Sequence, residues 1–134
     1  MDRVLFQKIE RLKEEVFYLK NKKTDLLKRL KASIEAKKIA ERSIYLCSEI
    51  ALDIADLVII KKGYPKPSTY SDSIYKLGEH AIMPKAFAHK FVYIAGLRNF
   101  LAHDYQKSTV PELEKFLKSG IKDTEQFIKY IERL

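Results

Sequence analysis

Residues 36–62 read AKKIAERSIYLCSEIALDIADLVIIKK and predict one long, largely buried helix. Apolar or small side chains recur there at steps of three and four, at Ile39, Ser43, Leu46, Ile50, Ile54, Leu57 and Val58. A stripe this wide is typical of a helix at the centre of a bundle, because a single neighbouring helix cannot cover it. The other segments are therefore expected to pack around residues 36–62.

The segment before this central helix has a narrower apolar face. Residues 2–20 predict an amphipathic helix whose inward side chains are Leu5, Ile9, Leu12, Val16 and Leu19. The polar residues 21–24 can interrupt it, with Thr24 as a possible cap. A helical pattern resumes at Leu26, Leu27, Leu30 and Ile34. The sequence leaves open whether residues 24–34 extend the first helix or form a separate turn.

Glycine and proline mark the end of the central helix. Gly63 suits a helix C-terminus, and the two prolines within residues 63–69 prevent a restart, which predicts a loop. Thr69 or Ser71 can cap a short helix after the loop. Pro84 fits the first turn of a further helix.

A last helix is expected after residue 109. Thr109 or Ser108 can cap it, and Gly120 can bend it. Its core face is expected to hold Leu113, Phe116, Leu117, Ile121, Phe127, Ile128 and Ile131. The sequence therefore predicts an all-α fold, an antiparallel helical bundle of four main helices plus one short helix, built as a single domain from residues 1–134.

Composition narrows the classes of protein that the chain can belong to. The single cysteine, Cys47, excludes an internal disulfide framework and suits a reducing cytoplasm. No apolar run approaches the roughly 20 residues that a membrane-spanning helix needs. The charged N-terminal stretch does not resemble a signal peptide. We therefore expect a cytoplasmic protein without a membrane segment.

Positive charge is concentrated at the N-terminal end. The chain carries a formal net charge of +8, of which residues 1–42 contribute +6 and residues 43–134 contribute +2. Such an excess can attract RNA or an acidic partner. Lysine and glutamate also alternate on solvated helix faces that bind nothing, and both interpretations stay open here.

Residues 97–105, LRNFLAHDY, gather more chemically capable side chains than any other window. Arg98 is a permanent cation whose planar fork suits a phosphate group. His103 can give and take protons near neutral pH. Asn99 lies four residues before His103 and can hold the imidazole or a phosphate oxygen. Tyr105 can stack on a base or pack on the core.

Metal binding is not indicated by the sequence. His80, His89 and His103 do not have the spacing of a zinc site, and no metal or cofactor is expected. Glu49 and Asp53 lie four residues apart on one face of the central helix. Paired carboxylates can bind metal or transfer protons, but without a nearby histidine we interpret this pair as structural or as orienting cationic side chains.

The spacing of Arg98 and His103 raises a geometric question. On an ideal helix, side chains five residues apart point about 140° away from each other. The two can face one narrow cleft only if the helix unwinds near His103, or if two copies of the chain share the cleft. A purely structural interpretation also exists, in which Arg98 pairs with a carboxylate and His103 caps a helix C-terminus.

The pattern Arg-x4-His-x-Tyr, at Arg98, His103 and Tyr105, resembles the signature of HepT-type toxins of the HEPN superfamily of small helical ribonucleases. The resemblance extends to residues 49–55 (EIALDIA) and to the loop at residues 63–70 (GYPKPSTY). It also includes the last helix, at residues 116–123 with Phe127 and Ile131. It covers about two thirds of the chain. Asp56 is a departure, since many members have histidine or asparagine there.

The resemblance implies a HEPN-like fold and a two-fold homodimer with both motifs at the interface. It implies a ribonuclease toxin, for which Arg98, His103 and Asn99 are the candidate catalytic residues. Because the sequence has no ligand cluster for a catalytic cation, we expect cleavage without metal. It also implies that a MntA-type nucleotidyltransferase antitoxin attaches AMP to Tyr105, and that Glu49 or Asp53 can position Arg98 or His103. The alternative is a non-enzymatic helical module that presents substrates to a nucleotidyltransferase or binds RNA.

Overall fold

The computed structural model describes residues 2–103 and 108–134, and every regular element in these two ranges is a helix. The predicted all-α class is therefore confirmed. The elements in chain order are α1 (Arg3–Arg29), α2 (Ile34–Lys61), α3 (Tyr70–Glu79), α4 (Lys85–Phe91), α5 (Tyr93–Ala102), α6 (Val110–Lys115), the π-helix η1 (Phe116–Gly120) and α7 (Ile121–Glu132).

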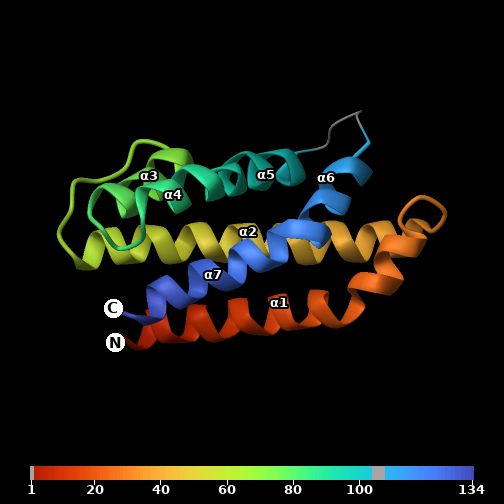
Figure 1. Ribbon diagram of the computed structural model, residues 1–134, viewed down its shortest axis with the longest axis horizontal. Helices are drawn as coiled ribbons and strands as arrows, with labels where there is room; N and C mark the ends of the chain where they lie inside the picture. Colours follow the sequence, from red (N-terminus) through yellow and green to blue (C-terminus); the bar gives the residue numbers. More distant parts are fainter. Residues whose placement is uncertain (1, 104–107) are drawn as a thin grey trace.

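The bundle is organised around α2, as predicted. In Figure 1, α2 runs through the middle, α1 and α7 lie along one side of it, and α3, α4 and α5 lie along the other. The two chain ends meet at the same end of the bundle (Figure 1). Because α2 is covered on both sides, its interior positions from Ala36 to Ile59 are largely buried.

The first helix is continuous, which settles the question left open by residues 21–24. Helix α1 runs through that polar stretch to Arg29, and Leu26 and Leu30 are buried beyond it. The polar residues lie on the outer face and do not break the hydrogen-bond ladder. A short turn follows, and the Ser33 hydroxyl caps α2 by accepting from the Ala36 N–H at 3.1 Å.

Two positions of the predicted apolar stripes are exposed. Ile34 is 72% exposed and Ile39 is 40% exposed, so neither belongs to the core. Both lie in the first turns of α2, where the helix is not covered on all sides. Leu27 of α1 is partly buried, and the other positions predicted for α1 and for the last helix are buried, as is Cys47.

The predicted fourth helix is two helices. Pro84 precedes α4, as expected, but the helix is interrupted at Val92 before α5 begins. There the Ala95 N–H bonds the Val92 carbonyl three residues back, at 3.1 Å, which is a tighter turn than the α-helical one. Helix α5, which holds Arg98, is thus a separate element of ten residues.

The last helix is also interrupted, by the π-helix η1 that ends at Gly120. A side chain at Gly120 would overlap the buried ring of Phe116, so a glycine is needed at this close approach. Thr109 precedes α6 but does not cap it, because its hydroxyl donates to Glu41 at 2.7 Å, while Ser108 accepts from the Val110 N–H at 3.3 Å. Thr69 does cap α3, as predicted.

None of the helices in residues 2–103 and 108–134 is both long enough and apolar enough to span a bilayer.

Candidate active site around Arg98 and His103

Helix α5 packs against α2, and this contact places Arg98 next to Glu49 of α2. The Arg98 Nε donates to Glu49 Oε2 at 2.7 Å, and both side chains are mostly shielded from solvent, with 21% and 28% exposed. This is the carboxylate partner required by the structural interpretation of Arg98. It also confirms that Glu49 contacts Arg98, one of the roles expected for the Glu49–Asp53 pair.

Two tyrosine rings complete the surroundings of the Arg98 guanidinium. Its Cζ lies 5.0 Å from the ring centroid of Tyr70 on α3 and 5.9 Å from that of Tyr45 on α2. Cation–π contacts of this kind favour a fixed orientation of the planar group. The Nη1 group donates to Asn99 Oδ1 at 3.3 Å, and no hydrogen bond from Nη2 is recorded within the described residues. The Nη edge can therefore hold an anion while Glu49 holds Nε.

Arg98, Glu49, Tyr45 and Tyr70 form what we call the Arg98 cluster, and their contacts set the ionisation states of its members. Burial acts to raise the pKa of Glu49, but hydrogen bonds from Arg98 and Tyr45 outweigh it and lower the pKa below its ordinary value. The hydrogen bond to Glu49 raises the pKa of Tyr45 and of Arg98. At neutral pH, Glu49 is thus a carboxylate and Tyr45 a neutral phenol. Glu49 serves to orient Arg98 and is a poor candidate for a proton-transfer group.

His103 lies at the end of α5, where the helix unwinds. Helix α5 ends at Ala102, and His103 is the C-cap residue with an extended backbone (φ −109°, ψ 151°). The extended ψ of His103 turns the chain only after this residue, so the end of the helix by itself does not remove the angular offset between Arg98 and His103. The His103 side chain is exposed.

A hollow of about 610 Å³ joins His103 to α2. It is lined by Lys38, Glu41, Arg42, Tyr45, Leu101, Ala102 and His103. Tyr45 belongs both to this hollow and to the Arg98 cluster, so it links the surroundings of the two motif residues. The guanidinium of Arg98 and the imidazole of His103 are therefore linked through one shared side chain.

Asn99 lies beside Arg98 rather than in the His103 hollow. Besides its bond to Arg98, Asn99 lines a second hollow of about 870 Å³ with Asp56 of α2, Tyr64 of the α2–α3 loop and Tyr70 of α3. Asp56, the position that departs from the family pattern, accepts from the Ser73 hydroxyl at 2.6 Å. Asp53 forms an ion pair with Lys8 of α1 at 3.2 Å, so it has no part in the Arg98 cluster.

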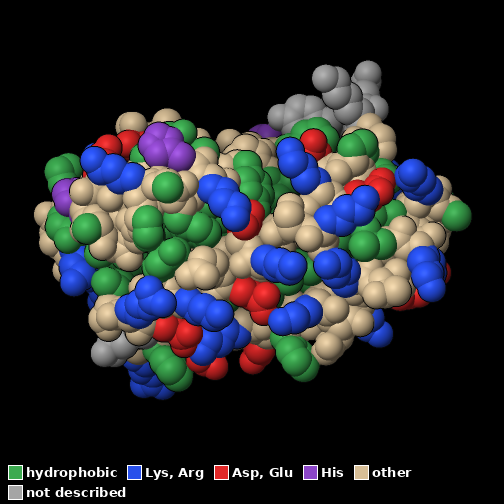
Figure 2. Space-filling view, viewed as in Figure 1, with side chains coloured by type: hydrophobic (Ala, Val, Ile, Leu, Met, Phe, Trp, Pro, Cys, Tyr) green, Lys and Arg blue, Asp and Glu red, His purple; other side chains and the backbone are tan. Residues whose placement is uncertain are grey.

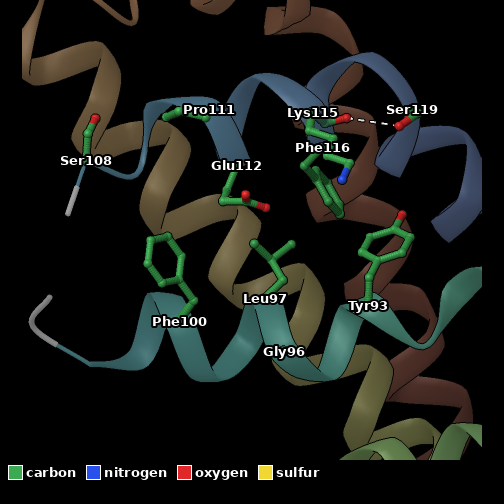
Figure 3. Close-up of a pocket in the computed structure, with 10 residues that line it drawn as sticks. All are labelled: Tyr93, Gly96, Leu97, Phe100, Ser108, Pro111, Glu112, Lys115, Phe116 and Ser119. Atoms are coloured by element: carbon green, nitrogen blue, oxygen red, sulfur yellow. Dashed lines mark hydrogen bonds between the residues drawn. The ribbon is translucent and has the colours of Figure 1, made fainter.

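The opposite flank of α5 borders a third, more apolar hollow of about 550 Å³. Figure 3 shows Tyr93, Leu97 and Phe100 pointing from α5 toward Pro111, Glu112 and Phe116 of the C-terminal segment. The Tyr93 hydroxyl donates to Asp123 at 2.8 Å, which ties α5 to α7. This tie fixes the position of the helix that holds Arg98.

Two residues of the cluster were not found by sequence reasoning. Tyr45 lies four residues before Glu49 on α2, a spacing that brings the two side chains together, but this signal is too common to single it out. Tyr70 reaches Arg98 from another helix, for which the sequence holds no local signal. Tyr105, the predicted modification site, lies outside the described residues.

Comparison with known proteins places the chain in a family. Residues 5–131 match the family model described as HepT-like, ribonuclease HepT-like. The chain belongs to the HepT-like family. The predicted relationship to HepT-type HEPN toxins is therefore confirmed.

Two curated HepT proteins match part of the chain. The tRNA nuclease HepT of Aphanizomenon flos-aquae is 32% identical over 74 residues, which are 55% of this chain and 50% of that protein. The mRNA nuclease HepT of Shewanella oneidensis is 27% identical over 85 residues, which are 63% of this chain and 64% of that protein. The matched segment thus spans about half to two thirds of the length of these relatives.

Solved structures show the same fold over the whole chain. One is a tri-AMPylated HEPN toxin of Shewanella oneidensis in complex with an MNT antitoxin, with a TM-score of 0.89 and 22% identity. Another is a toxin–antitoxin with AMP-PNP, with a TM-score of 0.88 and 20% identity. Both matches cover 100% of each chain. This HepT-like chain therefore has the HEPN toxin fold.

Proposed function

We propose that this HepT-like chain is a ribonuclease, the toxin of a toxin–antitoxin pair. The observation that supports the proposal most is the oriented guanidinium of Arg98, which Glu49 holds at 2.7 Å while its Nη edge stays available. Tyr45 connects this cation to the hollow that His103 lines. Two HepT relatives named as RNA nucleases point to RNA as the substrate class.

The chemistry requires two proton transfers and a cation. A base takes the 2′-hydroxyl proton, the 2′-oxygen attacks phosphorus, the bond to the 5′-oxygen breaks, and an acid protonates that leaving oxygen. His103 acts as base or acid, and a second His103 from a partner copy performs the other transfer. Arg98 stabilises the charge on the phosphorane through its Nη edge. Asn99, bonded to Nη1, keeps that edge in place or contacts a phosphate oxygen.

The products test this reaction directly. We expect the purified chain to cut single-stranded RNA in the presence of a metal chelator and to leave a 2′,3′-cyclic phosphate. Arg98 and His103 together supply the charge stabilisation and proton transfer that a catalytic metal would otherwise provide. The measurement is mass spectrometry of the fragments, with and without chelator. Activity that disappears with chelator and returns with one divalent ion would contradict the metal-independent mechanism.

We also propose that the active form is a homodimer whose two motifs share a cleft. The reaction needs a base and an acid, and a dimer that joins the α5 helices of two copies would supply one His103 and one Arg98 from each. A two-fold contact brings the same helix of both copies together. Sedimentation equilibrium at micromolar concentration should give twice the 15.7 kDa mass of the chain. A purely monomeric protein that cleaves RNA would contradict the shared cleft.

We propose that a MntA-type nucleotidyltransferase neutralises the toxin by attaching AMP to Tyr105. One HEPN toxin of the same fold is AMPylated and bound to an MNT antitoxin, which supports this kind of partner. An AMP group two residues from His103 would add negative charge where RNA phosphate must bind. Modification is therefore expected to inhibit by blocking the site.

The second candidate function is a non-enzymatic helical module that accompanies a nucleotidyltransferase or binds RNA. Two features favour it, and both are those of a purely structural motif. Arg98 is paired with Glu49, and His103 is the C-cap residue of α5. Absence of cleavage by the wild-type chain in the product assay above would favour this function.

A further inference from the structure

Two cations of α2 share the hollow that His103 lines. Lys38 and Arg42 are four residues apart, so they lie on one face of the helix, and both are exposed. His103 reaches the same hollow from the end of α5, more than sixty positions later in the sequence. The fold therefore brings two positive charges next to the imidazole.

Carboxylate partners for these two charges are absent among residues 2–103 and 108–134. Neither Lys38 nor Arg42 belongs to any ion pair recorded for the described residues, whereas Lys8, Lys13 and Lys20 of α1 are each paired with a carboxylate. Among the described residues that line the hollow, Glu41 is the one acid, and it accepts from the Thr109 hydroxyl at 2.7 Å. Other lysines on the surface are also unpaired, and what distinguishes these two cations is the hollow that they share with His103.

Tyr45 connects the two cations with Arg98. Its ring centroid lies 5.8 Å from Cζ of Arg42 and 5.9 Å from Cζ of Arg98. Sites for single-stranded nucleic acid combine a positive groove along the backbone with aromatic rings against which bases stack. Lys38, Arg42 and Tyr45 have this combination, and they lead from the His103 hollow to the Arg98 cluster.

We propose that Lys38 and Arg42 form a binding subsite for an RNA backbone phosphate next to the scissile one. The inference rests on the proposed ribonuclease function and adds a substrate contact on α2, outside the Arg-x4-His-x-Tyr motif. The subsite acts on substrate binding: the strand crosses the His103 hollow, one phosphate faces Arg98, and a neighbouring phosphate binds the two cations of α2. Because the contact is to the backbone, it does not depend on base sequence.

The test compares two double variants of the full chain that lose the same charge. In Lys38→Gln/Arg42→Gln the subsite is neutralised, and in Lys122→Gln/Lys129→Gln two exposed lysines of α7 are neutralised instead. We expect the first variant to raise the KM for a single-stranded RNA about 10- to 100-fold, with kcat within about threefold of wild type. The salt dependence of its binding should weaken by about 0.7 per lost charge. The α7 variant should differ little from wild type, and Arg42→Lys should keep most of the affinity.

Binding of a non-cleavable 2′-O-methyl RNA separates this inference from the proposed function. Loss of affinity for that RNA in the α2 variant, with the α7 variant unaffected, supports the subsite even if the wild-type chain fails to cleave. Equal effects of the two double variants would overturn the subsite and leave the ribonuclease proposal intact. Normal RNA binding combined with a lost complex with the cognate nucleotidyltransferase would also overturn it, because the cations would then serve an acidic protein partner.

Discussion

Replacing His103 with alanine should lower the rate of RNA cleavage by about 10²- to 10⁴-fold, which is the usual contribution of a positioned acid or base. Arg98→Ala should lower it by about 10²- to 10³-fold, because a single preorganised donor to the developing charge is lost. Both rates are measured on one labelled RNA under single-turnover conditions, so that chemistry rather than product release is observed. If either variant cleaved at a near-normal rate, its residue would lose the assigned role.

Matched variants separate catalysis from damage to the fold. His89→Ala removes another exposed histidine, one that packs against Tyr75 with ring centroids 4.9 Å apart, and it should leave the rate unchanged. Arg98→Ala leaves the Glu49 carboxylate without the hydrogen bond from Arg98. The double variant Arg98→Ala/Glu49→Gln removes this uncompensated charge and should remain inactive. Glu49→Ala should cost roughly 10- to 100-fold, since Arg98 would be misplaced but present. Helix content is checked by circular dichroism.

Replacing Tyr105 with phenylalanine should abolish AMP transfer by the cognate nucleotidyltransferase while leaving the toxin active. The substitution removes the hydroxyl that accepts AMP and keeps the aromatic ring. Co-expression with the nucleotidyltransferase followed by intact-mass spectrometry should show wild-type mass shifts in steps of AMP and an unmodified variant. Growth should stop in cells that carry the variant together with the antitoxin, because neutralisation by modification is lost.

The control for this result is another tyrosine on the surface. Tyr18 of α1 is 39% exposed, and Tyr18→Phe should be modified as fully as the wild type. A mass shift that persists in Tyr105→Phe would place the modification on a different residue. Modified wild-type protein should also remain a dimer, since the added group is expected to block the phosphate site and not the contact between copies.

Local patterns in the sequence were sufficient for most of the fold. Apolar steps of three and four predicted the buried faces of α1, α2 and the last helix, and Gly63, with φ of 69°, ends α2 where expected. Such patterns predict buried faces because the side of a helix that packs on the core must be apolar, whichever element it packs against. They failed at Ile34 and Ile39, which fit the apolar pattern but lie where no helix covers α2 fully. The interruption at Val92 has no clear local signal, whereas η1 ends at Gly120, where the sequence had indicated a bend.

The sequence by itself determined that the chain is a helical bundle, and it predicted that Arg98 and His103 belong to one functional window. Tertiary structure alone decided how the window is arranged: Glu49 binds Arg98 from 49 residues away, Tyr70 flanks it from α3, and Lys38 and Arg42 meet His103 in one hollow. Periodicity fixes which side of each helix is buried, but not how two helices are rotated and shifted along each other. That relative placement follows from packing of side chains across the whole bundle, and it determines which polar groups meet.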